Sequence, residues 1–344
     1  MSRFICNTKD LDNYIGHYIA QEVYDAKCRL LVNTNYKIDN KTSIALQKHE
    51  VYCVLISEEK IKKEPVSIEL RQAKTIEYRK TKLRNAFDDV RKEILSNKKR
   101  AFRPSVLLSQ ETLKKVEKAV DSILESIMSN PFIAVNLMPL EKDSDFLIRH
   151  SVNVCYLGLC FVSSYKQIFD ILRHPEKGMS RFEGRRNTNS PSDLVSFGIG
   201  CFLHDIGKLP MLDVVNLDIT YENKNKVWDT IKNHPAIGHE MLFGKNINAH
   251  ALLGIKFHHE NYDGSGYPYG ISDYKIHPYS RIIRILDSFD AGMTKRPGRE
   301  EKPFTDMLSE ILSLSGSHYD PEFVRLFIDM MLCGKSGLVG GFGN

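Results

Sequence analysis

The chain has 344 residues, of which 42% are hydrophobic and 26% charged, and its formal net charge is +5. This composition is ordinary for a soluble globular protein, and the length allows about two domains. The mild positive charge suits an anionic phosphate ligand but does not indicate a nucleic-acid polymer as partner.

The seven cysteines include no C-x-x-C pair, and such an unpatterned set fits a reducing cytosol better than a disulfide framework. We expect all seven to be packing residues. The N-terminus does not resemble a signal peptide. The longest apolar stretch, Leu194–Leu203, is about half of the roughly 20 residues that span a bilayer. We therefore expect a cytoplasmic protein without a membrane span.

Residues 1–62 are expected to form a small β-rich module with a regulatory or interaction role. Runs of β-branched and aromatic residues predict strands at Tyr18–Tyr24, Arg29–Val32 and Val51–Ile56, with a short helix at Asn40–Lys48.

Residues 63–104 are expected to be a helical linker. From Ser67 to Lys99 the sequence is charged, lacks Pro and Gly, and repeats apolar residues at helical spacing, which predicts one or two amphipathic helices. These helices could pair in a homodimer, and a simple spacer explains them equally well. The basic run Lys98–Pro104 is interpreted as solvated linker.

Residues 105–335 are expected to form a third region, a succession of helices. A polar, basic stretch at Arg173–Asp193 interrupts it and is expected to be a surface loop. Ser190 can cap the helix that follows, and Pro191 suits its first turn. The Gly-rich tail from Gly334 is expected to fray.

Histidines and aspartates recur in this region at the ends of apolar helical segments. A charged pair, His204-Asp205, follows directly on the apolar run Leu194–Leu203, and burying an aspartate there without a partner would be costly. A metal ion would supply the compensating charge. Imidazole and carboxylate ligands without thiolate suit Fe, Mn or Zn. The candidate ligands are His150, His204, Asp205, His234, His258, His259 and Asp287.

Two motifs carry a resemblance to a known family. His204-Asp-Ile-Gly-Lys208 resembles the signature of HD-domain metal phosphohydrolases. His258-His-Glu-Asn-Tyr-Asp-Gly-Ser-Gly-Tyr-Pro268 resembles the H-H-E-x-x-D-G-x-G-Y-P motif of the HD-GYP subfamily, at every fixed position. The resemblance covers roughly residues 140 to 335.

The resemblance implies a mainly α fold. In it an HD-type helical bundle forms the catalytic domain, and the small β-rich or mixed module precedes it in the chain. It implies a two-metal site in which His150, His204, Asp205 and Asp287 hold one ion. Asp205, His234, His258 and His259 would hold the other, so that Asp205 bridges. Such a pair can bind a hydroxide and aim it at phosphorus. Iron or manganese is the implied occupant, and zinc stays open.

The same resemblance assigns the phosphate-gripping role to Lys208, Arg296 and Arg299, although a surface ion pair explains Arg299 equally well. Lys208 would act beside the catalytic Asp205. Tyr267 is the implied substrate-facing side chain of the 263–268 loop, which could also dock signalling partners. Asp290 lies one turn after Asp287 and could hydrogen-bond to a metal-binding residue or contact the substrate. A solvent-facing helix position explains it as well.

The chain departs from the family pattern at Phe146, where members with a third metal carry a glutamate, and Asp145 would point about 100° away on a helix. We therefore expect two metals. The leading function is hydrolysis of cyclic di-GMP to pGpG, with further hydrolysis to GMP left open. The alternatives are a 3′,3′-cyclic GMP-AMP phosphodiesterase and a catalytically silent cyclic-dinucleotide receptor.

Overall fold

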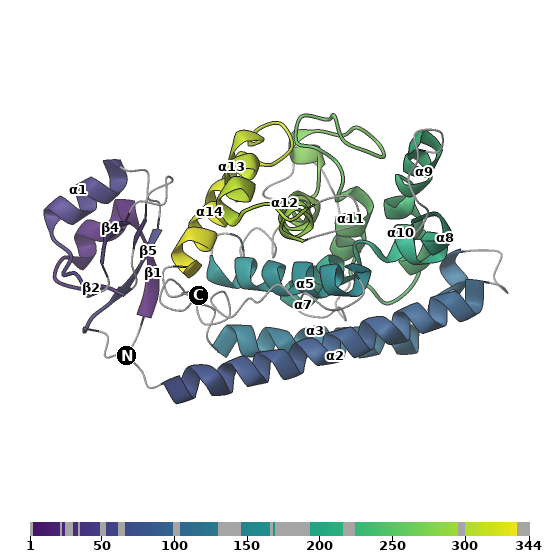
Figure 1. Ribbon diagram of the computed structural model, residues 1–344, viewed down its shortest axis with the longest axis horizontal. Helices are drawn as coiled ribbons and strands as arrows, with labels where there is room; N and C mark the ends of the chain where they lie inside the picture. The colour runs from purple at the N-terminus through teal and green to yellow at the C-terminus, as the bar shows by residue number, and fades with distance from the viewer. Residues whose placement is uncertain are drawn as a thin grey trace. The chain divides into compact units, whose positions relative to one another are not determined.

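The computed structural model shows a mainly helical protein with a small β-containing N-terminal part (Figure 1). It describes residues 3–20, 23–24, 30–33, 35–48, 53–60, 66–98, 104–129, 146–165, 168, 193–215, 224–294 and 300–335. The expected surface loop, apart from Asp193, lies outside these residues.

The chain divides into two compact units. One is built mainly from Met1–Lys74, and from Arg325 onward the chain is grouped with it. The other comprises Thr75–Ser129 and Pro139–Val324. The division into three parts at residues 62 and 104 stays a prediction.

The N-terminal unit contains two small antiparallel sheets. The three-stranded sheet has the order β1 (Arg3–Asn7), β5 (Cys53–Ser57), β2 (Tyr18–Ile19), and β5 pairs with both neighbours. In the second sheet β3 (Val23–Tyr24) pairs with β4 (Leu30–Val32). Helix α1 (Asn40–Lys48) and the 3-10 helix η1 (Thr8–Tyr14) complete the unit.

The strand expected at Tyr18–Tyr24 is two short strands that belong to different sheets. The β-branched and aromatic residues at both ends of the segment favour a strand and do not mark a division between two strands. Strand β1 and η1 were not anticipated. A shared core explains why the short elements hold together. It consists of Leu11, Ile19, Val23, Ile38, Leu46, Val54 and Ile56.

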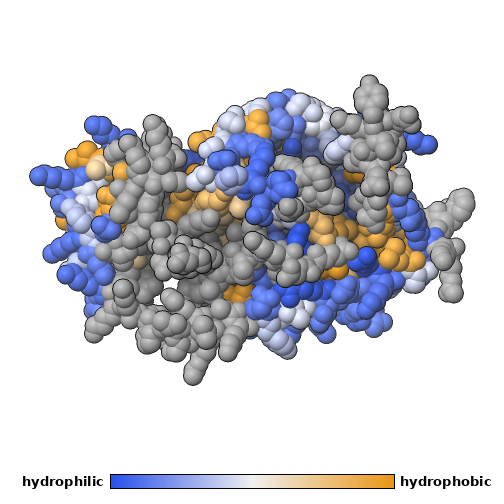
Figure 2. Space-filling model, in the orientation of Figure 1, coloured by the Kyte–Doolittle hydropathy of each residue, from blue (hydrophilic) through white to orange (hydrophobic). Residues whose placement is uncertain are grey.

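Two amphipathic helices follow, α2 (Val66–Lys98) and α3 (Gln110–Ser129), with the short η2 (Pro104–Val106) between them. The expected helical linker is thus a single helix over its described length. Its apolar positions Leu83, Phe87, Val90 and Ile94 are all buried, as the helical spacing required. Figure 2 shows hydrophilic side chains on the face of the molecule where α2 and α3 lie.

The centre of the larger unit is formed by α5 (Phe146–Ser164) and α7 (Asp193–Leu203), which pack on each other and against α3. Nearly every residue of both helices is buried, so both are core helices with no solvent-facing side. Helix α7 also packs on α11 (Ala249–Phe257), and α5 on α12 (Pro278–Met293). Helix α10 (His234–Leu242) packs on α11.

Shorter elements connect these helices: η4 (Ile206–Met211), α8 (Leu212–Val215), α9 (Lys224–Ile231) and η5 (Asp273–Lys275). Helices α13 (Phe304–Ser313) and α14 (Pro321–Lys335) end the described chain.

Among the described residues, α5 alone has the length and apolar composition of a membrane-crossing helix, with a window of mean hydropathy 1.4. However, 89% of that window is buried inside the protein. This is the environment of a core helix in a globular domain. Cys155, Cys160 and Cys201 are buried in the same core as free thiols.

Candidate metal centre

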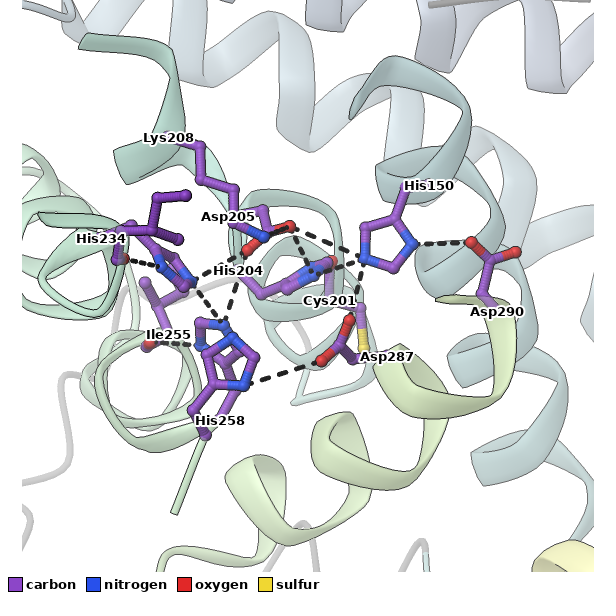
Figure 3. Close-up of polar contacts among 12 residues, drawn as sticks. His150, Cys201, His204, Asp205, Lys208, His234, Ile255, His258, Asp287 and Asp290 are labelled. Atoms are coloured by element: carbon purple, nitrogen blue, oxygen red, sulfur yellow. Dashed lines mark hydrogen bonds and ion pairs between the residues drawn. The ribbon is translucent and has the colours of Figure 1, made fainter. Parts of the chain in front are cut away.

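The seven candidate ligands come from five places in the helical unit and converge on one point (Figure 3). His150 lies in the first turns of α5, and His204 and Asp205 follow the last residue of α7. His234 begins α10, the pair His258-His259 follows α11, and Asp287 lies within α12.

A glycine makes this convergence possible. Gly207 in η4 lies so close to α10 that a Cβ atom there would clash with the carbonyl oxygen of His234 and lie 2.7 Å from the backbone nitrogen of Gly238. Only glycine permits this approach. The glycine of the H-D-x-G-K motif therefore sets the distance between Asp205 and His234.

One group of ligand atoms consists of His150, His204 and Asp287. The Nε2 atom of His150 lies 3.0 Å from Oδ1 of Asp287 and 3.2 Å from Nε2 of His204. All three residues are buried. They match three of the four ligands expected for one metal.

The other group consists of Asp205, His234, His258 and His259. The Nε2 atom of His234 lies 3.0 Å from Oδ1 of Asp205 and 3.1 Å from Nε2 of His258. These four are the residues expected at the second metal.

Asp205 faces both groups with different oxygens. Its Oδ1 lies 3.0 Å from His234 Nε2 and 3.7 Å from His258 Nε2. Its Oδ2 lies 3.5 Å from His204 Nε2 and 3.7 Å from His150 Nε2. A carboxylate placed in this way is suited to bridge two cations.

The hydrogen bonds made by the Nδ1 atoms of the imidazoles indicate what their Nε2 atoms, which face the centre, can bind. Nδ1 lies 2.7 Å from a backbone carbonyl oxygen in His204, His234 and His258 alike. A neutral imidazole that donates from Nδ1 carries a lone pair on Nε2. The lone pairs of His234 and His258 thus face each other at 3.1 Å with no proton to share. Lone pairs beside buried carboxylates are the donor set of a cation site, so the residues fit a metal pair.

Burial and charge keep most of these groups in the protonation states that a metal requires. Burial lowers the pKa of His204 to about 3 and that of His234 to about 4. Burial opposes the charge of Asp205, but Lys208 and His204 outweigh it and hold the pKa of Asp205 well below its usual range. Burial also disfavours protonated His150, but Asp287 and Asp290 raise its pKa to about 9.

Asp290 is buried behind His150 and does not point to solvent. Its Oδ2 lies 2.6 Å from Nδ1 of His150, and its Oδ1 accepts a hydrogen bond from Nδ2 of Asn153 at 2.8 Å. The sequence left two roles open for Asp290. The geometry favours a carboxylate that orients the metal-binding residue His150, and not a substrate contact. Asn153, in the segment His150-Ser-Val-Asn153 that also resembles the family, was not among the predicted site residues.

Lys208 is near the centre, as its spacing from Asp205 indicated. Its Nζ lies 2.6 Å from Oδ2 of Asp205. Phe146 stacks on the His150 ring with centroids 5.4 Å apart and thus presents an aromatic ring where the family's third-metal glutamate would stand.

The loop after His259 is held by residues of its own motif. The buried carboxylate of Glu260 accepts a hydrogen bond from the backbone N–H of Tyr269 at 2.7 Å. A Cβ on Gly266 would clash with the backbone of His259 to Asn261, so only glycine fits there. Tyr267 stacks on the His259 ring with centroids 4.7 Å apart, which places it beside the candidate ligands.

Arg296 and Arg299 lie outside the described residues, so their phosphate-binding role stays a prediction. The sequence analysis also passed over Arg284, one turn before Asp287 on α12. Its contacts with Asn261 and Tyr319 join segments that are distant in the sequence, so no local pattern pointed to it.

Several known proteins resemble this chain in sequence. A family model described as HD domain matches residues 171–323, a range that excludes His150. A cyclic di-GMP phosphodiesterase of Thermotoga maritima is 37% identical over 134 residues, covering 37% of this chain and 35% of the relative. One of Pseudomonas aeruginosa is 26% identical over 211 residues, covering 61% and 45%.

A 3′3′-cGAMP-specific phosphodiesterase of Vibrio cholerae is 28% identical over 170 residues, covering 47% of this chain and 37% of the relative. The chain thus spans less than half the length of these relatives. A solved HD-GYP-type protein of Bdellovibrio bacteriovorus has a TM-score of 0.49 and 15% identity, covering 96% of this chain and 98% of that one. The HD-domain model thus covers less than half of this chain, and the H-H-E-x-x-D-G-x-G-Y-P motif lies within the matched range.

Proposed function

We propose that the protein is a metal-dependent phosphodiesterase that hydrolyses cyclic di-GMP to pGpG. The observation that carries the proposal is the convergence of two groups of imidazoles and carboxylates on Asp205 and Asp287, in which the lone pairs of His234 and His258 face each other. The names of the relatives supply the substrate class.

In this proposal His150, His204, Asp205 and Asp287 hold one divalent ion, and Asp205, His234, His258 and His259 hold the other. When bound, two such ions polarise phosphate oxygens and lower the pKa of water. Iron and manganese are the proposed occupants on grounds of family resemblance, and the ligand set also suits zinc.

The chain's own residues would perform the remaining tasks. Lys208 pairs with the Asp205 oxygen that faces His150 and His204, so its ammonium group lies where it would donate to a phosphate oxygen of a bound substrate. Tyr267, stacked on His259, would contact the substrate. Asp290 would keep Nε2 of His150 directed at its ion.

The test is incubation of protein loaded with manganese or iron with cyclic di-GMP, followed by chromatography of the products. We expect pGpG with the native protein and none with Asp205→Ala, and two metal ions per chain by elemental analysis. Intact substrate in the presence of two bound metals would contradict the cyclic di-GMP proposal.

A second substrate is 3′,3′-cyclic GMP-AMP, because relatives named for its hydrolysis also match. Parallel incubation of both cyclic dinucleotides with the same preparation separates the two proposals. If neither is cleaved but both bind, the receptor alternative takes their place. The cytoplasmic location, the homodimer and the signalling partners stay predictions.

A further inference from the structure

The side chain of Arg284 is held in a fixed orientation near the candidate metal centre. Its Nε donates to Oδ1 of Asn261 at 3.1 Å, and its NH1 donates to Oγ of Ser288 at 2.6 Å. The guanidinium carbon lies 5.5 Å from the centroid of the Tyr319 ring. Contacts within its own helix and with two other segments, at Asn261 and Tyr319, limit the freedom of the group.

The charge of Arg284 has no carboxylate partner among the residues that the structure describes. Arg281, three residues earlier on the same helix, is paired with Asp320 in the buried interior. Arg284 is only half-buried, and its polar contacts are with the neutral Asn261 and Ser288. A guanidinium has five N–H groups, so the two hydrogen bonds leave three for a ligand.

The position of Arg284 relates it to the substrate side of the centre. It precedes Asp287 by one helical turn, and its partner Asn261 lies two residues after His259. The hydrogen bond to Asn261 therefore ties the guanidinium to the segment that carries His259.

We propose that Arg284 binds the second, non-reacting phosphate of a cyclic dinucleotide whose first phosphate is at the metal ions. This inference rests on the proposed function. A cyclic dinucleotide carries two phosphodiester groups, and cleavage of one leaves the other as an anion that needs a partner. A pre-oriented guanidinium without a carboxylate suits this task, because it binds phosphate through paired hydrogen bonds.

The test compares the native protein with Arg284→Gln on two substrates, cyclic di-GMP and bis(p-nitrophenyl) phosphate, which has a single phosphate. For cyclic di-GMP we expect KM to rise about 10- to 100-fold with a much smaller change in kcat, the loss expected of hydrogen bonds to a charged group. Hydrolysis of bis(p-nitrophenyl) phosphate and the metal content should be unchanged. Arg284→Lys, which keeps the charge, should recover part of the loss.

Ser288→Ala is the matched control, since it removes a contact that orients Arg284 but leaves the charge, and we expect a smaller rise in KM. Equal losses on both substrates would mean that Arg284 supports the loop structure, and an unchanged KM for cyclic di-GMP would exclude phosphate binding. Either result overturns the inference. If the native protein cleaves bis(p-nitrophenyl) phosphate but not cyclic di-GMP, the proposed function itself fails, and the inference fails with it.

Discussion

Nδ1 of His150 lies 2.6 Å from Oδ2 of Asp290, and both side chains are 1% exposed. This pair determines which nitrogen of His150 faces Asp287 and His204, because Nδ1 is engaged by the carboxylate. A ligand held in this way binds its metal more tightly than a freely rotating imidazole.

Replacement of Asp290 by asparagine should therefore weaken metal binding at the group of His150, His204 and Asp287. We expect the affinity for one of two ions to fall about 10- to 100-fold, because the amide cannot accept from both His150 and Asn153. Metal titration followed by elemental analysis measures this. Asp121→Asn on the exposed side of α3 is the control, and wild-type affinity for both ions in the Asp290 variant would contradict the prediction.

Removal of metal should lower the thermal stability of the native protein. Without cations, the lone pairs of His234 and His258 face each other beside the buried charge of Asp205. Metal at 1,000 times its Kd stabilises the fold by about 4 kcal/mol, which chelation would remove. Differential scanning fluorimetry with and without chelator measures the shift. The midpoint of Asp205→Ala should move much less, and a native midpoint insensitive to chelation would argue against the metal centre.

Gly207→Ala should disrupt the centre although residue 207 is not a ligand. The added methyl group clashes with the His234 carbonyl and lies 2.7 Å from the Gly238 nitrogen, so η4 and α10 must separate. We expect loss of bound metal together with a lower midpoint of unfolding. Gly200→Ala is the matched control, because its Cβ would meet α11 no closer than 3.5 Å. Equal metal content in both variants would refute this explanation.

Lys80→Met should stabilise the protein at neutral pH. The Lys80 ammonium is buried 4.4 Å from the centroid of the Tyr156 ring, and burial lowers its pKa to about 8. Because the folded protein disfavours the charged form, the cost is fully present below pH 8 and disappears as pH rises toward the unfolded value near 10.5.

The gain from Lys80→Met is at most about 3 kcal/mol below pH 8, reduced by the lost contact with the Tyr156 ring. It should shrink between pH 8 and about 10.5. Urea unfolding across this pH range measures the difference in unfolding free energy between the variant and the native protein. Lys114→Met, at an exposed position of α3, is the control. If the stability difference between Lys80→Met and the native protein stays constant or widens as the pH rises, burial of the charged Lys80 is not its cause.

The sequence by itself determined the helical character and the candidate ligands. Apolar spacing predicted α2 to within one residue at each end, because an amphipathic helix must bury one face. The two motifs contain four of the seven candidate ligands, His204, Asp205, His258 and His259. A buried aspartate there needs a cation to offset the cost of its burial. The same local rules failed at Tyr18–Tyr24, where pairing partners decide whether a strand continues.

Only the tertiary structure decided how distant residues meet. No local pattern could show that Asp205 turns one oxygen to each histidine group, because this depends on the approach of α10 to Gly207. The sequence allowed Asp290 to face solvent, contact substrate or support a metal-binding residue. The packing of α5 on α12 placed its carboxylate against His150. Arg284 became visible for the same reason. Whether a charged residue has a partner is a property of the packed helices and not of its neighbours along the chain.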